Sequence, residues 1–283
     1  IVIMLHGGGQ NLDNFKAAWP LPVLVNTSTD AVDKAIVLVP YGLAHLDVAD
    51  GPQRDWNIWD NNSFENPNDR LFLEDMLDHA KPLIETYYAA RGVTREGFDE
   101  ERVFAFGYSA GGMMAFKYAS YYNNRFAAMV LVCSACGGRQ VVGGSTFTNN
   151  PILVASPPGM SLMLYVGGAD PTVPPGGLTS TGLQPSVAAR DALEDSGLTS
   201  TEASDFCVNY RSARTSTQAY LDFNHVIDSS FNDDFLNPDT NTTGQPDVGG
   251  GTQRSTRTWR GTSGNNPVVK LVYDVVMTHD PTA

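Results

Sequence analysis

The sequence has little cysteine, little positive charge and no long apolar run, and each absence excludes a class of protein. Three cysteines in 283 residues are too few for a disulfide framework and lack the spacing of zinc ligands. No run of about eighteen apolar residues occurs, so no membrane-spanning helix is expected. Only five of the 18 basic residues are lysines, and 31 acidic residues bring the net charge to −13. This charge repels phosphate backbones, so no nucleic acid is expected as a partner.

The composition is that of a folded chain with room for one large core. Apolar residues make up 42% of the sequence and charged residues 17%, which excludes disorder, collagen and coiled coil. We expect a single domain over residues 1–283, present as a monomer. The scarcity of lysine favours an exported protein, secreted or periplasmic, and a bridge between Cys136 and Cys207 would fit an oxidising compartment.

Short apolar or β-branched runs alternate with helical patterns along the chain. This alternation predicts an α/β protein in which a mostly parallel sheet carries helices on both faces. Strands are expected at 1–5, 35–39, 102–106, 127–133, 161–166 and 268–276, and helices at 69–91, 110–122 and 183–196. In the expected helix 69–91, apolar side chains recur every three or four residues and predict one stripe that faces the sheet.

Two segments depart from this alternation. Residues 199–266 are rich in Ser, Thr, Asn, Asp and Gly and have little periodicity, which predicts a long loop-rich insertion or lid over the site. At the other end, the chain opens directly inside the apolar run Ile1–Leu5. We therefore expect the first strands of the domain, and any export signal, to lie upstream.

The most informative segment places a serine between an expected strand and an expected helix. It contains the pattern G-x-S-x-G as Gly107, Ser109 and Gly111. A serine on so sharp a turn needs neighbours without side chains, and the turn exposes its hydroxyl above the sheet. The helix N-terminus that follows favours developing negative charge. Ser109 is therefore the expected nucleophile.

A glycine-rich loop, His6–Gln10, directly follows the first expected strand. Consecutive glycines allow backbone N–H groups to point at one oxygen, as an oxyanion hole requires. We expect the donors to be Gly8 and Gly9, together with Ala110 after the serine. A phosphate-binding loop is excluded because no Lys-Ser/Thr pair follows, and His6 itself is interpreted as structural.

A nucleophilic serine needs a base, and the base needs an acid to orient it. In folds with a serine on this kind of turn, the three catalytic groups follow in the chain order serine, acid, histidine. Each lies just beyond the carboxyl end of a strand. Asp170 lies in the turn after the expected strand 161–166, and His279 lies three residues beyond the strand 268–276. They are the expected acid and base. A turn-capping role is the alternative for Asp170.

Other titratable residues receive structural interpretations. His225 lies inside the polar segment 199–266, where a solvated or lid histidine is the favoured interpretation. Asp274 is expected within the last strand and is discounted as the acid. Residues 239–250 resemble the first half of a calcium loop, but Gly250 stands where the bidentate Glu is needed. No metal site and no cofactor are expected.

Taken together, these motifs resemble those of a known family. The segments that carry the resemblance are His6–Gln10, Arg102–Val103, Gly107–Met113, Phe126–Ala128, Gly168–Pro174 and the terminal strand with His279. They are similar to the α/β-hydrolase esterases that include polyhydroxybutyrate depolymerases, feruloyl esterases and acetylxylan esterases. The resemblance implies an α/β-hydrolase fold and a secreted serine esterase with Ser109 as nucleophile, Asp170 as acid and His279 as base. One departure concerns the rim of the site, where the family's Gly-His-x-Trp-Pro is replaced by Thr278–Pro281.

The expected substrate is a feruloyl or acetyl ester, or a polyester of hydroxyalkanoate or aromatic type. Trp56 and Trp59 follow the second strand and are expected to stack on such a substrate, with ordinary packing as the alternative. Tyr108 and Met113 flank the nucleophile and either line the acyl pocket or pack behind it. Two other functions remain open, a peptidase or amidase with the same triad and a non-catalytic polymer-binding module.

Overall fold

The computed structural model describes the parts of the chain that build the sheet and the segments at its carboxyl edge. The described residues are 1–21, 35–42, 44–45, 53–54, 56, 58, 68–92, 102–122, 125–135, 139–142, 145–148, 160–173, 216–217, 221, 245–246, 253–260, 268–274 and 276–279. The fold and the site are described for these residues.

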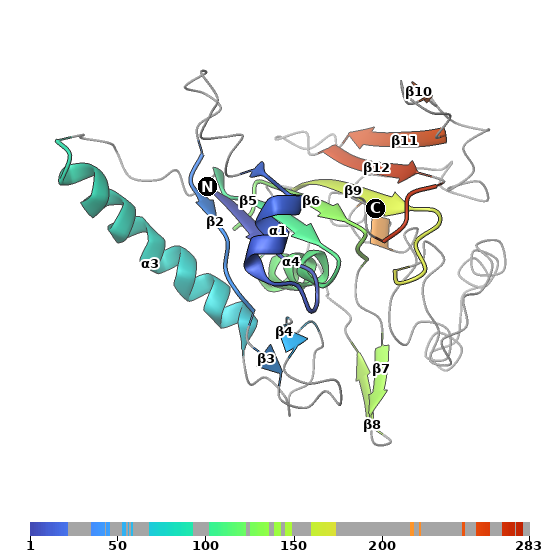
Figure 1. The fold of residues 1–283 in the computed structure, drawn as a ribbon, viewed down its shortest axis with the longest axis horizontal. Coiled ribbons are helices and arrows are strands. Elements are labelled where there is room, and N and C mark those ends of the chain that lie inside the picture. Colours follow the sequence, from blue (N-terminus) through green and yellow to red (C-terminus); the bar gives the residue numbers. More distant parts are fainter. Residues whose placement is uncertain are drawn as a thin grey trace.

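An eight-stranded sheet forms the centre of the molecule (Figure 1). Its parallel strands are β1 (Val2–Leu5), β2 (Val37–Leu38), β5 (Phe104–Tyr108), β6 (Ala128–Val132), β9 (Ser161–Gly167) and β12 (Val268–Asp274). Two antiparallel strands, β11 (Gln253–Arg260) and β10 (Gln245–Pro246), extend it at one side. The order across the sheet is β10-β11-β12-β9-β6-β5-β1-β2.

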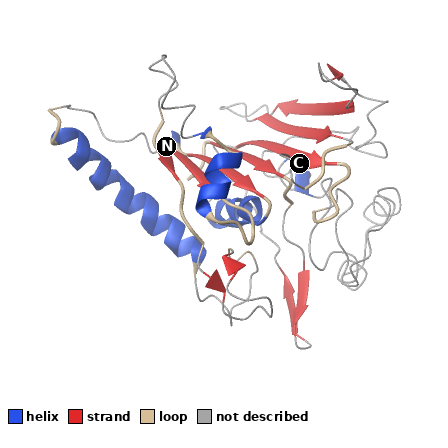
Figure 2. Ribbon diagram, viewed as in Figure 1, coloured by secondary structure: helices blue, strands red, loops and turns tan. Residues whose placement is uncertain are grey.

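Helices and two small hairpins lie outside this sheet (Figure 2). In the described part of the chain, the longer helices are α1 (Leu12–Ala18), α3 (Asp69–Ala89) and α4 (Ala110–Tyr121). The hairpins pair β3 (Ala44–His45) with β4 (Gln53–Arg54) and β7 (Arg139–Val142) with β8 (Ser145–Thr148). Side chains cap the starts of α1 and α3: Asn11 accepts a hydrogen bond from the Asn14 N–H, and Asn68 accepts one from the Leu71 N–H.

Alternation along the strands gives the sheet two buried faces. In β1, Ile3 and Leu5 belong to the larger apolar cluster, which includes residues of α3 and α4. Met4, between them, belongs to a second cluster with Phe15 of α1 and with Val132 of β6. Because successive side chains of a strand point to opposite faces, α1 covers one face and α4, backed by α3, covers the other. The predicted α/β class, with a mostly parallel sheet and helices on both faces, is confirmed.

The parallel strands bring their carboxyl ends to one edge of the sheet. The pairing places Leu5 opposite Gly107, and Val132 opposite both Tyr108 and Tyr165. The loops that follow β1, β5, β6, β9 and β12 therefore begin side by side. In open parallel sheets this edge is where ligands bind.

The helix α3 buries only part of its apolar stripe. Leu73, Leu77 and Ala80 are buried, whereas Leu83 is 69% exposed and Tyr87 54% exposed. The carboxyl half of α3 extends past the sheet in Figure 1, so the prediction of one continuous stripe on the sheet is wrong there.

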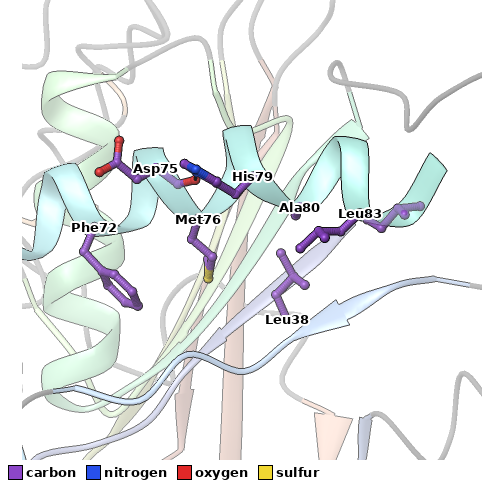
Figure 3. A pocket seen from close by; sticks show the side chains of 8 residues that line it. Leu38, Phe72, Asp75, Met76, His79, Ala80 and Leu83 are labelled. Carbon is purple, nitrogen blue, oxygen red and sulfur yellow. Dashed lines mark hydrogen bonds between the residues drawn. The ribbon is translucent and has the colours of Figure 1, made fainter. Parts of the chain in front are cut away.

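A mostly apolar groove of about 470 Å³ runs between α3 and β2. Its lining residues are Leu38, Phe72, Asp75, Met76, His79, Ala80, Leu83 and Ile84. Figure 3 shows Phe72 and Met76 pointing from α3 toward the segment that contains Leu38 of β2.

Most of the expected elements are present within two residues of their predicted ends. The helix α1 and the strands β3, β4, β7, β8, β10 and β11 were not predicted, and β10 and β11 lie inside the stretch expected to be an insertion. The expected helix 183–196 and most of the polar segment 199–266 lie outside the described residues. None of the helices in the described part of the chain combines the length and apolar character needed to cross a membrane.

Candidate active site

Ser109 occupies a strained turn between β5 and α4. Its backbone has φ 51° and ψ −122°, a conformation that residues other than glycine rarely adopt. Its N–H still donates to the Val132 carbonyl, at 2.9 Å, so the turn begins directly at the end of the sheet. A Cβ atom at Gly107 would lie 2.5 Å from the Gly112 Cα. The glycine at 107 is therefore required by the close return of the chain, as the sequence pattern predicted.

The start of α4 also packs against the end of β1. A Cβ atom at Gly111 would lie against the carbonyl oxygens of Leu5 and His6. Because only a glycine permits this approach, the turn that carries Ser109 and the loop that follows β1 are held at backbone contact. The nucleophile and the expected oxyanion loop thus belong to one packed unit.

Hydrogen bonds of its own residues shape the loop after β1. The Gly7 N–H donates to the Gln10 side-chain oxygen at 2.9 Å, and the Gln10 N–H donates to the Gly7 carbonyl at 3.3 Å. Gly8 and Gly9 are exposed, and Gly9 has φ 70°. Among the described residues no group accepts a hydrogen bond from the N–H of Gly8, Gly9 or Ala110. These three donors remain available for an oxyanion.

His6 is buried beneath this loop and has both ring nitrogens engaged. Its Nε2 accepts from the Gly42 N–H at 3.0 Å, so Nδ1 carries the proton and donates to the Gly7 carbonyl at 2.8 Å. The indole N–H of Trp56 donates to the His6 carbonyl at 2.8 Å. Trp56 is only 2% exposed, so in this structure it supports the loop and offers a substrate almost no surface. The structural interpretation of His6 agrees with these contacts.

Asp170 and His279 meet at the edge of the sheet, although 109 positions separate them in the chain. His279 Nδ1 donates to Asp170 Oδ2 at 2.9 Å, and the other carboxylate oxygen accepts from the N–H groups of Thr172 and Val173, at 2.8 Å each. The Asp170 side chain is fully buried and that of His279 is 21% exposed. With Nδ1 bound to the carboxylate, the second ring nitrogen of His279 carries the lone pair that a base uses.

Tyr108 and Cys133 hold the segment that carries His279. The Tyr108 hydroxyl donates to the His279 carbonyl at 2.5 Å, and the two rings lie 5.5 Å apart. The Cys133 thiol lies 3.7 Å from the Thr278 carbonyl. Tyr108 was predicted to line the acyl pocket or to pack behind it, and the structure gives its hydroxyl a partner in the loop of the base.

One group of metal-ligating side chains is found in the described part of the chain. Ligand atoms of Cys133, Asp170 and His279 lie within 4.8 Å of one another. The hydrogen bond between Asp170 and His279 already uses two of these atoms. That pairing has the geometry expected of an acid that orients a base.

The remaining predicted positions fall into the core or outside the description. Met113 is 2% exposed and packs in the larger apolar cluster behind the nucleophile. Trp59, His225, Cys136 and Cys207 lie outside the described residues. Sequence reasoning did not identify Cys133 as a neighbour of the site. Its position directly after a buried strand, at the same edge as Ser109, was the signal that could have placed it there.

The parallel sheet, the strained serine turn after β5 and the acid and histidine loops after β9 and β12 define an α/β hydrolase. The comparison with family models agrees, because the model described as alpha/beta hydrolase fold matches residues 82–245, more than half of the chain. The chain belongs to the α/β-hydrolase fold family.

Solved structures of esterases are among those similar to this chain. The carboxylesterase of Bacillus cereus is 17% identical, with 80% of this chain and 88% of that chain covered and a TM-score of 0.35. Esterase PE8 is 16% identical, with coverage of 70% and 78% and a TM-score of 0.37. No significant match was found among curated proteins.

Proposed function

We propose that the protein is a serine carboxylic-ester hydrolase that works through an acyl-enzyme. The observation that carries the proposal is the bond between Asp170 and His279 at the sheet edge that also holds Ser109 on its strained turn. Ser109, Asp170 and His279 follow the ends of β5, β9 and β12 respectively. Their order along the chain is therefore serine, acid, histidine, although they come from distant parts of the sequence.

In the proposed mechanism, Ser109 Oγ attacks the ester carbonyl while His279 takes its proton. Asp170 keeps the imidazole oriented and stabilises its positive charge. The N–H groups of Gly8, Gly9 and Ala110 bind the oxyanion of the tetrahedral intermediate, and the start of α4 adds a favourable dipole. The imidazolium returns its proton to the leaving alkoxide, and water then releases the acyl group by the same steps.

The substrate class rests on the resemblance of the motifs and on the charge of the chain. We infer an ester of feruloyl or acetyl type, or a polyester of hydroxyalkanoate or aromatic type, because the net charge of −13 disfavours anionic polymers. A panel of methyl ferulate, acetylated xylan, polyhydroxybutyrate and a terephthalate ester, compared by kcat/KM, distinguishes these classes. Release of the protein into the medium or the periplasm, as a monomer, belongs to the same proposal.

Replacement of the nucleophile tests the mechanism. The variant Ser109→Ala should lower kcat on a p-nitrophenyl ester by about three to six orders of magnitude, because no acyl-enzyme can form. It should retain the circular dichroism spectrum and melting temperature of the wild type. The matched control is Thr86→Ala, which removes a hydroxyl on the exposed side of α3 and should leave activity unchanged. Activity of Ser109→Ala within about tenfold of the wild type would refute the proposal.

Labelling by a fluorophosphonate probe separates the alternative functions. A serine hydrolase is labelled stoichiometrically at Ser109, whereas a non-catalytic polymer-binding module is not labelled. Parallel assays on an ester and an amide of the same acyl group then distinguish an esterase from a peptidase or amidase. Amide turnover equal to ester turnover would assign the protein to the peptidases or amidases.

A further inference from the structure

Three consecutive carbonyl groups hold the segment after β12 in place, each through a residue of a different neighbouring strand end. The contacts are Met277 O with the Ala169 N–H at 3.2 Å, Thr278 O with the Cys133 thiol at 3.7 Å and His279 O with the Tyr108 hydroxyl at 2.5 Å. Ala169, Cys133 and Tyr108 come from the carboxyl ends of β9, β6 and β5. The backbone of the proposed base is therefore anchored to the ends of three neighbouring strands.

Of the two side-chain contacts, the one made by Tyr108 is stronger than the one made by Cys133. A phenolic hydroxyl is a good donor and a thiol is a weak one, and the distance of 2.5 Å is short against 3.7 Å for the thiol. Tyr108 is only 6% exposed, so water competes little for the same carbonyl. Loss of this hydroxyl would leave the His279 carbonyl without its partner from β5.

Tyr108 also touches the other two parts of the site. It directly precedes Ser109, so its position is coupled to the nucleophile through one peptide bond. A Cβ atom at Gly7 would lie 2.9 Å from the Tyr108 ring, which places the ring against the oxyanion loop. The ring packs as well against Trp19, with 5.8 Å between centroids. One residue thus contacts the loops of the nucleophile, the oxyanion hole and the base.

We propose that Tyr108 is a positioning residue, which sets the separation of Ser109 and His279 through its hydroxyl bond to the His279 carbonyl. This inference rests on the proposed function, since it assigns a role within the same site. The ring and the hydroxyl act separately: the ring supports the oxyanion loop, and the hydroxyl fixes the base. The described hydrogen bond of the Tyr108 hydroxyl goes to a backbone carbonyl of the base. Its effect reaches the chemistry through the placement of the imidazole, where errors of about 1 Å cost up to about 10²-fold in rate.

The variant Tyr108→Phe tests the hydroxyl alone, because phenylalanine keeps the ring. We expect kcat on a p-nitrophenyl ester to fall between about 10-fold and 100-fold. KM should change by less than about twofold, since substrate binding is not altered. The rate of fluorophosphonate labelling should fall with kcat. The matched control is Tyr87→Phe, the same chemical change at a 54% exposed tyrosine on α3, which should behave as the wild type.

The outcomes separate this inference from the proposed function. If wild-type protein is not labelled at all, the proposed function fails. If the wild type is labelled and Tyr108→Phe matches its kcat and labelling rate, the positioning role is refuted. A general structural role predicts instead a lower melting temperature with kcat preserved in the folded fraction. If Tyr108→Phe is only partly folded, its kcat is divided by the folded fraction measured by circular dichroism, and a corrected kcat equal to that of the wild type overturns the inference.

Discussion

Two residues other than glycine adopt positive φ in the described part of the chain, and both lie at this site. Ser109 has φ 51° and Cys133 has φ 47°. Each directly follows a strand, and each N–H still donates to the next strand, to Val132 and Tyr165 respectively, at 2.9 Å. Such conformations cost about 1–3 kcal/mol each and persist only where the surroundings impose them. The sheet supplies that constraint and delivers a hydroxyl and a thiol to the edge where His279 lies.

Ser134, next to Cys133, provides a test of buried polarity. Its hydroxyl is buried and has no hydrogen-bond partner within the described residues. We expect Ser134→Ala to raise the free energy of unfolding by about 1 kcal/mol, because a buried unpaired hydroxyl is unfavourable. Urea unfolding measures the change.

The matched variant is Ser161→Ala at the start of β9. The Ser161 hydroxyl accepts from the Val268 N–H at 3.0 Å, so its removal leaves a backbone donor unpaired. We expect Ser161→Ala to lower the free energy of unfolding by about 1 kcal/mol. The same substitution should thus have opposite signs at the two positions. Destabilisation by Ser134→Ala equal to that of Ser161→Ala would contradict the interpretation.

At the scale of elements, a polar network joins α3 to α4 and the segment after it. Glu74 accepts from the Tyr118 hydroxyl and from the Arg125 guanidinium, and Arg125 also pairs with Asp78 at 3.1 Å. Burial, and then the bond to Glu74, raises the pKa of Tyr118, so the phenol remains a donor at neutral pH. The bond to Glu74 likewise raises the pKa of Arg125. Glu74 is therefore the centre of the contact between the two helices.

The variant Glu74→Gln should lower the free energy of unfolding by about 1–3 kcal/mol. It leaves Arg125 without its closest carboxylate, and the Glu74 and Arg125 side chains are only 17% and 29% exposed. Glu85→Gln, the same change at an exposed position of α3, should change it by less than about 0.5 kcal/mol. Equal effects of the two variants would show that the network contributes nothing.

The pH dependence of this network has a definite sign. A group whose pKa is raised on folding contributes stability below its unfolded pKa, and this contribution is lost as pH rises toward the folded value. For Tyr118 the loss begins near pH 10, the ordinary range of a tyrosine. The network should therefore contribute a constant stability through neutral pH.

At the scale of the whole molecule, the net charge of −13 sets which substrates approach. We expect kcat/KM to be lower for an anionic ester, such as mono-p-nitrophenyl succinate, than for neutral p-nitrophenyl acetate. The difference should shrink as salt rises from about 10 mM to about 0.5 M, because salt screens the repulsion. An identical salt response of the two esters would show that the charge does not act at the site.

Much of the fold was predictable because the signals are local. The strands β1, β5, β6, β9 and β12 arise from apolar runs that are bounded by glycine or by polar residues. Strands buried on both faces accept few residues other than apolar ones, so these runs are visible in the sequence. The strand β11 was missed because its sequence, Gln253–Arg260, is polar and its pairing with β12 decides its state. The helix α1 is only seven residues long, too short for a reliable periodic signal.

The sequence by itself determined the sharp turn at Ser109, the glycine loop after β1 and the order of serine, acid and histidine, because steric limits on single residues and strand order leave few alternatives. The tertiary structure alone decided that the Tyr108 hydroxyl meets the His279 carbonyl, that Cys133 lies beside the acid and the base, and that Trp56 is buried under the oxyanion loop. The Tyr108 and Trp56 contacts join residues 171 and 50 positions apart. The register of the parallel strands brings Tyr108, Cys133, Asp170 and His279 together at one edge of the sheet.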